Sequence, residues 1–184
     1  MLTLIRAGLY TSVQDGGREG LRQSGISRCG ALDYPSLVIA NLLVGNEANA
    51  AGLEITLGQV EIEFARSGWF ALTGAACEAT LDGKAVWVGW RTAYRPGQRL
   101  VLKTPQHGIR SYLAVAGGIA VPEVLGSRCT DLKADWRSGR TPPAGRRQAE
   151  ARESRPPLHH PARRQAAAAG QPHSCAARAG VPRI

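Results

Sequence analysis

The sequence predicts a mainly β protein, a closed or nearly closed β-barrel with one or two covering helices. Short stretches of alternating apolar and polar residues recur between turn residues over the first 135 positions, and only one stretch there shows clear helical spacing. From residue 136 onward the composition changes, and only four bulky apolar residues remain. We therefore expect one globular domain over residues 1–135 and a disordered tail over residues 136–184.

The strands follow from period-two alternation. Residues 59–64 alternate apolar and charged side chains, which places the apolar ones on one face of a half-buried strand. Residues 78–81 and 84–88 flank the dipeptide Asp82-Gly83, which suits the positive φ angles of a type I′ hairpin turn. Further strands are expected at residues 53–57, 99–104 and 111–116.

The clearest helix signal follows Asp33, whose carboxylate can cap free backbone N–H groups. Pro35 falls in the first turn, where its missing donor costs little, and Gly45 marks the end of the apolar repeat. A second, shorter helix is expected at residues 123–125, ending at Gly126.

The net charge of +9 belongs almost entirely to the tail. Residues 1–135 carry 13 basic and 12 acidic side chains, whereas residues 136–184 carry 10 and 2. Ten arginines favour salt-dependent phosphate contacts, but Trp136 is the only aromatic residue there that could stack on bases. We expect nonspecific adhesion and no specific nucleic-acid partner.

Other classes of protein lack support in the sequence. The N-terminus shows no basic region followed by an apolar one, and the longest apolar runs reach about half a membrane span. The four cysteines are widely spaced without a C-x-x-C motif, and only His107 lies in the globular part. We expect no membrane partner, no metal site, no disulfide framework and a reducing, cytoplasmic location.

The densest cluster of polar and glycine residues runs from Gln14 to Gly20. Glycines such as Gly17 let the backbone approach a ligand, and Arg18 can hold a carboxylate or phosphate. The alternative is a tight turn braced by an ion pair between Asp15 and Arg18. Neither G-x-x-x-x-G-K-S/T nor G-x-G-x-x-G after a strand occurs, so we do not expect the chain to bind a nucleotide by itself.

Three further residues allow two interpretations each. Glu54 lies in the apolar stretch 53–57: pointing inward it would need a cation or donor and would be a candidate acid, base or binding group, whereas pointing outward it is ordinary alternation. Asn41 and Asn46 can bind substrate, or they are a helix-face amide and a loop amide.

A second polar cluster follows the glycine-rich segment 116–122. Ser127, Arg128 and Asp131 can meet at a strand-to-helix corner. Ser127 as a triad nucleophile has no support, because the globular part offers only the distant His107 as a base.

Several motifs of the first 134 residues occur together, in order and nearly without gaps, in one known family. They comprise residues 12–18, 33–36, 40–46, 53–56, 116–119 and 125–128. With them the chain resembles the 5-oxoprolinase C-subunit family, also called KipA, allophanate hydrolase subunit 2 or the biotin-dependent carboxyltransferase family.

The resemblance implies a cyclophilin-like β-barrel, usually as one of two related barrels. It implies a small-molecule substrate and a component that acts with the A subunit and a KipI-like B subunit in the ATP-dependent opening of 5-oxo-L-proline to L-glutamate. ATP would serve the complex and be bound mainly outside this chain. The alternatives are the carboxyltransferase component of a urea carboxylase or allophanate hydrolase system, in which biotin takes part, and a KipA-like regulatory protein without catalysis.

The family motifs also supply the candidate substrate-binding residues. They are Gln14, Asp15, Gly17, Arg18, Asp33, Asn41, Asn46, Glu54, Ser127, Arg128 and Asp131. No catalytic role is assigned to any of them. The chemistry they allow is binding of a carboxylate or carboxyphosphate by Arg18 or Arg128, with backbone N–H groups stabilising developing negative charge.

The resemblance ends near residue 134, where the family continues into a second barrel. Of the 49 residues from 136 onward, 32 are Ala, Arg, Pro or Gly, the residues encoded by G/C-only codon pairs. We expect a reading-frame shift near codon 135, and a first barrel that is inactive alone or dependent on a partner.

Overall fold

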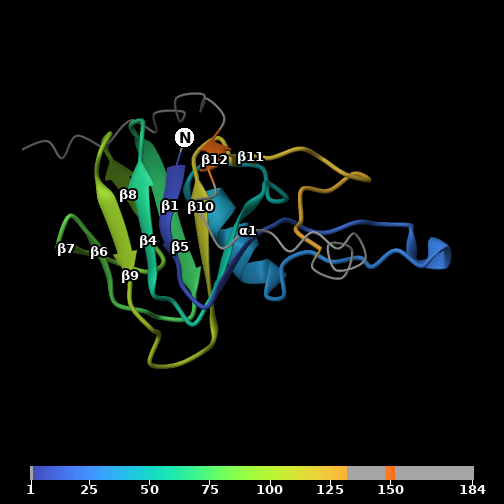
Figure 1. Ribbon diagram of the computed structural model, residues 1–184, viewed down its shortest axis with the longest axis horizontal. Coiled ribbons are helices and arrows are strands. Elements are labelled where there is room, and N and C mark those ends of the chain that lie inside the picture. The colour runs from blue at the N-terminus through green and yellow to red at the C-terminus, as the bar shows by residue number, and fades with distance from the viewer. Residues whose placement is uncertain (1, 132–147, 152–184) are drawn as a thin grey trace, which may run out of the picture.

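Two antiparallel sheets and one α-helix make up the part of the chain that the computed structural model describes, residues 2–131 and 148–151 (Figure 1). The larger sheet has the order β11-β12-β1-β4-β9-β6-β7, and the smaller has the order β2-β3-β10-β5-β8. The strands are β1 (Leu2–Ala7), β2 (Tyr10–Gln14), β3 (Gly52–Thr56), β4 (Val60–Phe64), β5 (Gly68–Gly74), β6 (Ala79–Leu81), β7 (Lys84–Val86), β8 (Arg91–Tyr94), β9 (Arg99–Leu102), β10 (Arg110–Val115), β11 (Ile119–Ala120) and β12 (Gln148–Ala151).

The predicted mainly β class is confirmed, whereas most of the tail lies outside the described residues. Within the tail, Gln148–Ala151 forms strand β12 between β1 and β11, so these four residues are not the unstructured chain that composition predicts. The strand lies between two antiparallel neighbours, whose backbone groups it pairs with regardless of its own side chains.

The core lies between the two sheets. Ile62 and Leu100 of the larger sheet and Ile55 and Leu113 of the smaller one are fully buried in the same apolar cluster. The alternation predicted for residues 59–64 is confirmed, because Val60, Ile62 and Phe64 are buried while the intervening glutamates are partly exposed. Phe64 also stacks on Tyr94, with ring centroids 3.8 Å apart. Apolar burial between the sheets therefore supplies the main stabilisation.

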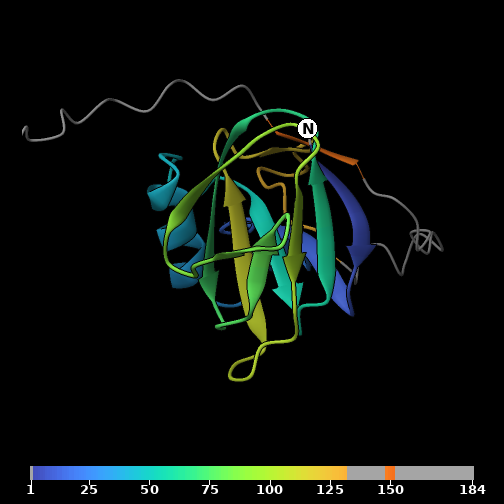
Figure 2. The same cartoon turned by 90° about the vertical axis from the view of Figure 1, so that its left-hand side faces the viewer.

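Helix α1 (Tyr34–Leu43) covers the outer face of the smaller sheet, as Figure 2 shows from the side. Asp33 caps it as predicted, accepting hydrogen bonds from the backbone N–H of Ser36 at 3.2 Å and from its hydroxyl at 2.6 Å. Ala40 packs against Ala71 of β5 and Ala114 of β10, and these small side chains let the helix approach the sheet closely. Among the described residues no helix has the length and apolar character to cross a membrane.

The second predicted helix, at residues 123–125, is wrong. Leu125 and Gly126 both adopt positive φ angles, 56° and 78°, and the chain reverses there in a turn. Val124 and Ser127 exchange backbone hydrogen bonds across it, at 2.8 and 3.3 Å. A right-handed helix has no place for two consecutive residues of positive φ.

Two segments project together beyond the sheets, away from the core (Figure 1). The first, which we call the arm, comprises residues 16–32 between β2 and α1 and includes the short 3-10 helix Arg22–Ser24. The second, which we call the closing segment, comprises residues 121–131 after β11. The glycine-rich motif and the second polar cluster of the sequence lie on these two neighbouring segments.

Candidate functional site

Asp15 joins the arm to the closing segment. It follows β2 directly and is 4% exposed. Its Oδ1 accepts hydrogen bonds from the backbone N–H of Gly17 at 2.8 Å and from the Ser127 hydroxyl at 2.6 Å, and its Oδ2 accepts one from the backbone N–H of Arg128 at 2.6 Å. Three donors from both segments therefore converge on one buried carboxylate, which fixes the position of Arg128.

Arg18 is bound by the closing segment. Its Nε donates to the carbonyl of Val124 at 3.2 Å, and its Nη2 donates to that of Cys129 at 3.4 Å. Its Nη1 lies 3.6 Å from the Asp131 carboxylate and makes no hydrogen bond within the part of the chain described. The ion pair predicted as an alternative, between Asp15 and Arg18, is replaced by one between Arg18 and Asp131.

Gln14 and Gly17 complete this junction. The Gln14 side-chain amide donates to the Ser12 hydroxyl at 3.0 Å and to the Thr130 carbonyl at 3.2 Å. Gly17 has a φ of 84°, and a Cβ there would lie 2.5 Å from the carbonyl oxygen of Arg28. Only glycine fits this close approach of the outgoing and returning chain of the arm.

Cys29, on the arm, donates its thiol hydrogen to the Thr130 carbonyl at 3.0 Å. Burial raises the pKa of Cys29 to about 11, and a hydrogen bond with the Cys129 thiol acts in the same direction. The Cys29 side chain is therefore held as a neutral thiol at neutral pH.

Asn41 and Asn46 hold the loop that follows α1. Asn41 donates to the carbonyl of Ala50 at 2.7 Å and accepts from Asn46 at 3.0 Å. Asn46 also accepts from the backbone N–H of Gly117 at 2.8 Å, across to the turn after β10. Asn46 lines the polar cavity described below, and the fully buried Asn41 supports its loop.

Glu54 belongs to a separate buried network beneath the start of α1. It lies on the outer, helix-covered face of the smaller sheet, in ordinary alternation with its apolar neighbours, and is nevertheless 5% exposed. It accepts hydrogen bonds from Arg110 at 2.7 Å, from the Tyr112 hydroxyl at 2.9 Å and from the backbone N–H of Leu32 at 2.9 Å. Both interpretations of Glu54 therefore hold in part: it points away from the core and it has a cation and donors.

Tyr112 links this network to the helix cap. Its hydroxyl accepts a hydrogen bond from the backbone N–H of Asp33 at 2.7 Å while donating to Glu54. Burial, followed by smaller contributions from Glu54, raises the pKa of Tyr112 well above its ordinary value. The hydroxyl therefore stays protonated and positions the first residue of the cap.

A polar cavity of about 480 Å³ lies where the two glycine-rich segments meet. Arg128 lines it with a side chain that is about one-third exposed, and its guanidinium lies 3.3 Å from the Glu123 carboxylate. The loop after α1 forms another wall, and Asn49 there accepts a hydrogen bond from the backbone N–H of Gly16 at 2.6 Å. The lining residues are Asp15, Val44, Gly45, Asn46, Glu47, Asn49, Ala50, Ala51, Gly117, Gly118, Ile119, Glu123, Gly126 and Arg128.

The structure brings three of the predicted site residues to this cavity: Asp15, Asn46 and Arg128. The other eight do not line it. Gln14, Gly17, Arg18, Ser127 and Asp131 belong to the junction behind it, Asn41 supports its loop, and Asp33 and Glu54 belong to the helix-cap network.

Sequence reasoning missed three polar residues of the cavity, Glu47, Asn49 and Glu123. Glu123 was assigned to a helix that does not form, and nothing in the sequence distinguishes the other two from ordinary loop residues. Chemically, the guanidinium can bind a carboxylate while the two exposed carboxylates accept N–H groups or a proton.

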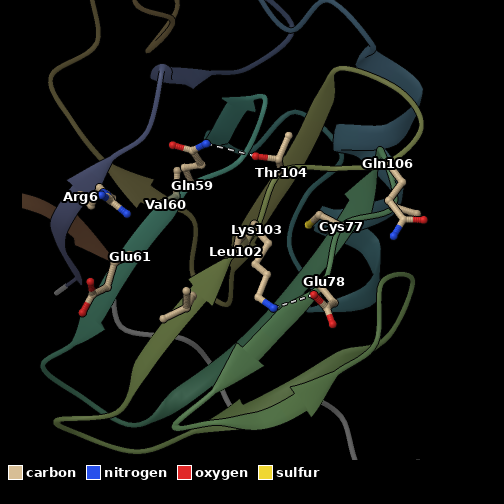
Figure 3. Close-up of a pocket in the computed structure, with 12 residues that line it drawn as sticks. Arg6, Gln59, Val60, Glu61, Cys77, Glu78, Leu102, Lys103, Thr104 and Gln106 are labelled. Carbon is tan, nitrogen blue, oxygen red and sulfur yellow. Dashed lines mark hydrogen bonds and ion pairs between the residues drawn. The ribbon is translucent and has the colours of Figure 1, made fainter.

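A second cavity, of about 630 Å³, lies over the larger sheet (Figure 3). Lys103 and Glu78 point toward one another across it and form an ion pair at 2.8 Å, and Gln59 donates to Thr104 at 3.3 Å. Two pairs of its polar side chains bind each other, and it contains none of the predicted site residues. The cavity at Arg128 is therefore the stronger candidate for a functional site.

A two-sheet fold with this junction is that of a carboxyltransferase domain. The family model "Carboxyltransferase domain, subdomain A and B" matches residues 24–179, and the chain belongs to this family.

Individual relatives support the same family assignment. The chain is 72% identical over 133 residues to the C subunit of 5-oxoprolinase from Escherichia coli, and 36% identical over 124 residues to urea amidolyase of Saccharomyces cerevisiae. These alignments cover 72% and 67% of the chain, but only 43% and 7% of the respective relatives. The chain thus spans less than half the length of the 5-oxoprolinase component that it matches.

Solved structures give the same result. The crystal structure of the Kluyveromyces lactis urea carboxylase superposes with a TM-score of 0.68 at 35% identity, over 70% of this chain and 12% of that one. That of the protein TTHA0988 superposes with a TM-score of 0.69 at 36% identity, over 72% and 50%.

Proposed function

We propose that the chain is part of a 5-oxoprolinase, the ATP-dependent enzyme that opens the lactam of 5-oxo-L-proline to give L-glutamate, and that it acts with the A and B subunits of that enzyme. The observation that carries this proposal is the 72% identity to the 5-oxoprolinase C subunit, set against 36–38% for the urea amidolyase and urea carboxylase relatives.

The cavity at Arg128 fits such a substrate in chemical type. 5-Oxoproline carries one carboxylate and one lactam N–H, and both need partners when the molecule leaves water. The Arg128 guanidinium supplies a cation for the carboxylate, while Glu47 and Glu123 supply acceptors for the N–H. Asp15 holds the backbone of Arg128, which keeps that cation at the mouth of the cavity.

The charge of this cavity disfavours ATP more strongly than a ligand with a single carboxylate. Its lining includes three carboxylates against one guanidinium, and Glu123 already pairs with that guanidinium. A triphosphate would therefore meet more negative than positive charge. We place the main ATP site outside this chain, in the other components of the complex, so that this chain contributes substrate binding.

A second candidate is the carboxyltransferase component of a biotin-dependent urea carboxylase or allophanate hydrolase system. It is favoured by the shared domain, since "Putative urea carboxylase" of Emericella nidulans is 38% identical over 131 residues. A third, a KipA-like regulatory protein, would bind the B subunit without catalysis.

Reconstitution tests these alternatives. The full chain is mixed with the A and B subunits of the E. coli enzyme, and L-glutamate formation from 5-oxoproline and ATP is measured. Turnover that requires all three proteins supports the proposal. Turnover by the A and B subunits alone, or urea-dependent consumption of ATP with a biotin carboxylase partner in their place, contradicts it. Complex formation without turnover favours the regulatory protein.

A further inference from the structure

A third cavity, of about 520 Å³, lies on the arm, and its lining contains three arginines. We propose that it binds a phosphate group, at a site separate from the cavity at Arg128. The proposal concerns the arm alone and does not rest on the identity of the substrate. The lining residues are Arg18, Glu19, Gly20, Arg22, Gln23 and Arg28.

Backbone contacts hold the three arginines around this cavity. The backbone N–H of Arg18 donates to the carbonyl of Arg28 at 2.7 Å, which joins the outgoing and returning chain of the arm. At the tip, the backbone N–H of Gly25 donates to the carbonyl of Arg22 at 3.0 Å and closes the short 3-10 turn. Main-chain hydrogen bonds thus place the backbones of the three arginines around one cavity.

The positive charge of the cavity is incompletely compensated. Arg18 is 8% exposed, and its Nη1 makes no hydrogen bond within the described part of the chain, with Asp131 at 3.6 Å. Arg28 has Glu19 at the same distance, and both side chains are mostly exposed. Arg22 has no ion pair among the residues that the structure describes. The ion pairs of Arg18 and Arg28 are both long, and Arg22 has none among the described residues, so the cavity carries a net positive charge.

This arrangement suits an oxyanion with several oxygens. Arginine presents a planar fork of N–H donors that matches phosphate oxygens, and the Gln23 amide adds a neutral donor at the rim. Arginines that served only to brace the arm would each be tied to neighbouring groups, as Arg18 is through Val124 and Cys129. Arg22 has no ion pair in the described part of the chain, and Arg28 has only the long, exposed pair with Glu19.

Calorimetric titration of the full chain with inorganic pyrophosphate, at about 0.15 M salt to suppress long-range attraction, tests the proposal. The double variant R22Q/R28Q should bind roughly tenfold more weakly. The matched control R66Q/R95Q removes the same charge from exposed arginines outside the arm and should bind like wild type. E19Q, which removes the competing carboxylate, should bind about two- to fivefold more tightly.

Two further titrations define the ligand. Inorganic phosphate should bind with the same dependence on the variants, and acetate should bind much more weakly. Equal losses in R22Q/R28Q and R66Q/R95Q would show general attraction to a basic chain and overturn the site, as would the absence of pyrophosphate binding by wild type. Acetate binding as strong as phosphate binding would overturn the ligand class. Far-UV circular dichroism of each variant checks that it is folded, and none of these outcomes bears on the 5-oxoproline assay.

Discussion

Asp15 and Ser127, 112 residues apart in the chain, are joined by a buried hydrogen bond of 2.6 Å from the serine hydroxyl to the carboxylate. The same carboxylate accepts from the backbone of Gly17 and Arg128, so it connects the end of β2, the arm and the closing segment. Asp15, a predicted substrate-binding residue, thus mainly holds the arm and the closing segment together.

D15N tests that role. An amide nitrogen in place of one carboxylate oxygen would face an N–H donor, so at least one of three hydrogen bonds to a charged group is lost. We expect the free energy of unfolding to fall by about 2–3 kcal/mol, measured by urea denaturation. The control is E47Q, an exposed carboxylate of the same cavity, which should change stability by less than about 0.5 kcal/mol. Equal effects of the two substitutions would contradict the anchoring role.

The helix cap gives a second prediction. Y112F removes a hydroxyl that accepts from the backbone of Asp33 and donates to Glu54, and leaves both groups without that partner inside the protein. We expect a loss of about 1–3 kcal/mol in thermal or urea unfolding. Y94F is the matched control, because the buried Tyr94 ring stacks on Phe64 while its hydroxyl makes no hydrogen bond in the described part of the chain. A Y94F loss as large as that of Y112F would show that the network contributes nothing specific.

The sequence predicts the local parts of this fold well. The Asp33 cap, the Asp82-Gly83 turn and the alternation of residues 59–64 all depend on near neighbours, and the structure confirms each. The prediction for the closing segment fails because Leu125 adopts a positive φ that its side chain disfavours. That turn is held by backbone bonds between Val124 and Ser127 and by a hydrogen bond from Arg18 of the distant arm.

The candidate site shows the same difference between local features, which the sequence predicts, and long-range contacts, which it does not. Motifs identify the residues at the junction, but not which of them face a cavity. Asp15 and Arg18 are buried and make hydrogen bonds to the closing segment, more than 100 positions away, whereas the Arg128 side chain is about one-third exposed. Such long-range pairing has no signature in spacing or periodicity.

Alanine substitutions at two glycines of the arm distinguish the cost of backbone strain from the cost of steric overlap. Gly20 and Gly30 have similar positive φ angles, 75° and 90°, but a Cβ at Gly20 meets open space whereas one at Gly30 lies 2.8 Å from the backbone nitrogen of Gly17. G20A should cost about 1 kcal/mol through its φ alone, and G30A about 1–3 kcal/mol more through overlap with backbone. Urea denaturation measures both. Equal costs would mean that the outgoing and returning chain of the arm are not in close contact at Gly30.

Cys29 gives a prediction about pH. With its pKa raised to about 11 by burial, the reactive thiolate at pH 8 is about 100-fold scarcer than for a cysteine of pKa 9.0. Alkylation of Cys29 by iodoacetamide should therefore be slow at pH 8 and rise about tenfold per pH unit toward pH 11. Mass spectrometry of the Cys29 peptide follows the rate, and chain unfolded in urea serves as the control with an ordinary rate. Labelling of the folded chain at the unfolded rate at pH 8 would refute the buried, hydrogen-bonded thiol.

Substitution of Arg128 should affect substrate binding without affecting stability. Its backbone N–H donates to Asp15 whatever the side chain, so R128Q should keep the junction and lose only the guanidinium in the cavity. In the reconstituted complex we expect the KM for 5-oxoproline to rise roughly tenfold or more, with a smaller change in kcat, because a charge-assisted bond to the substrate carboxylate is lost. R66Q, at an exposed position outside the cavity, controls for the change in net charge.

R128K should restore part of the affinity, because lysine returns the charge without the planar fork. An unchanged KM in R128Q would place the substrate carboxylate elsewhere, while a fall in stability similar to that of D15N would show that the side chain, too, serves the junction.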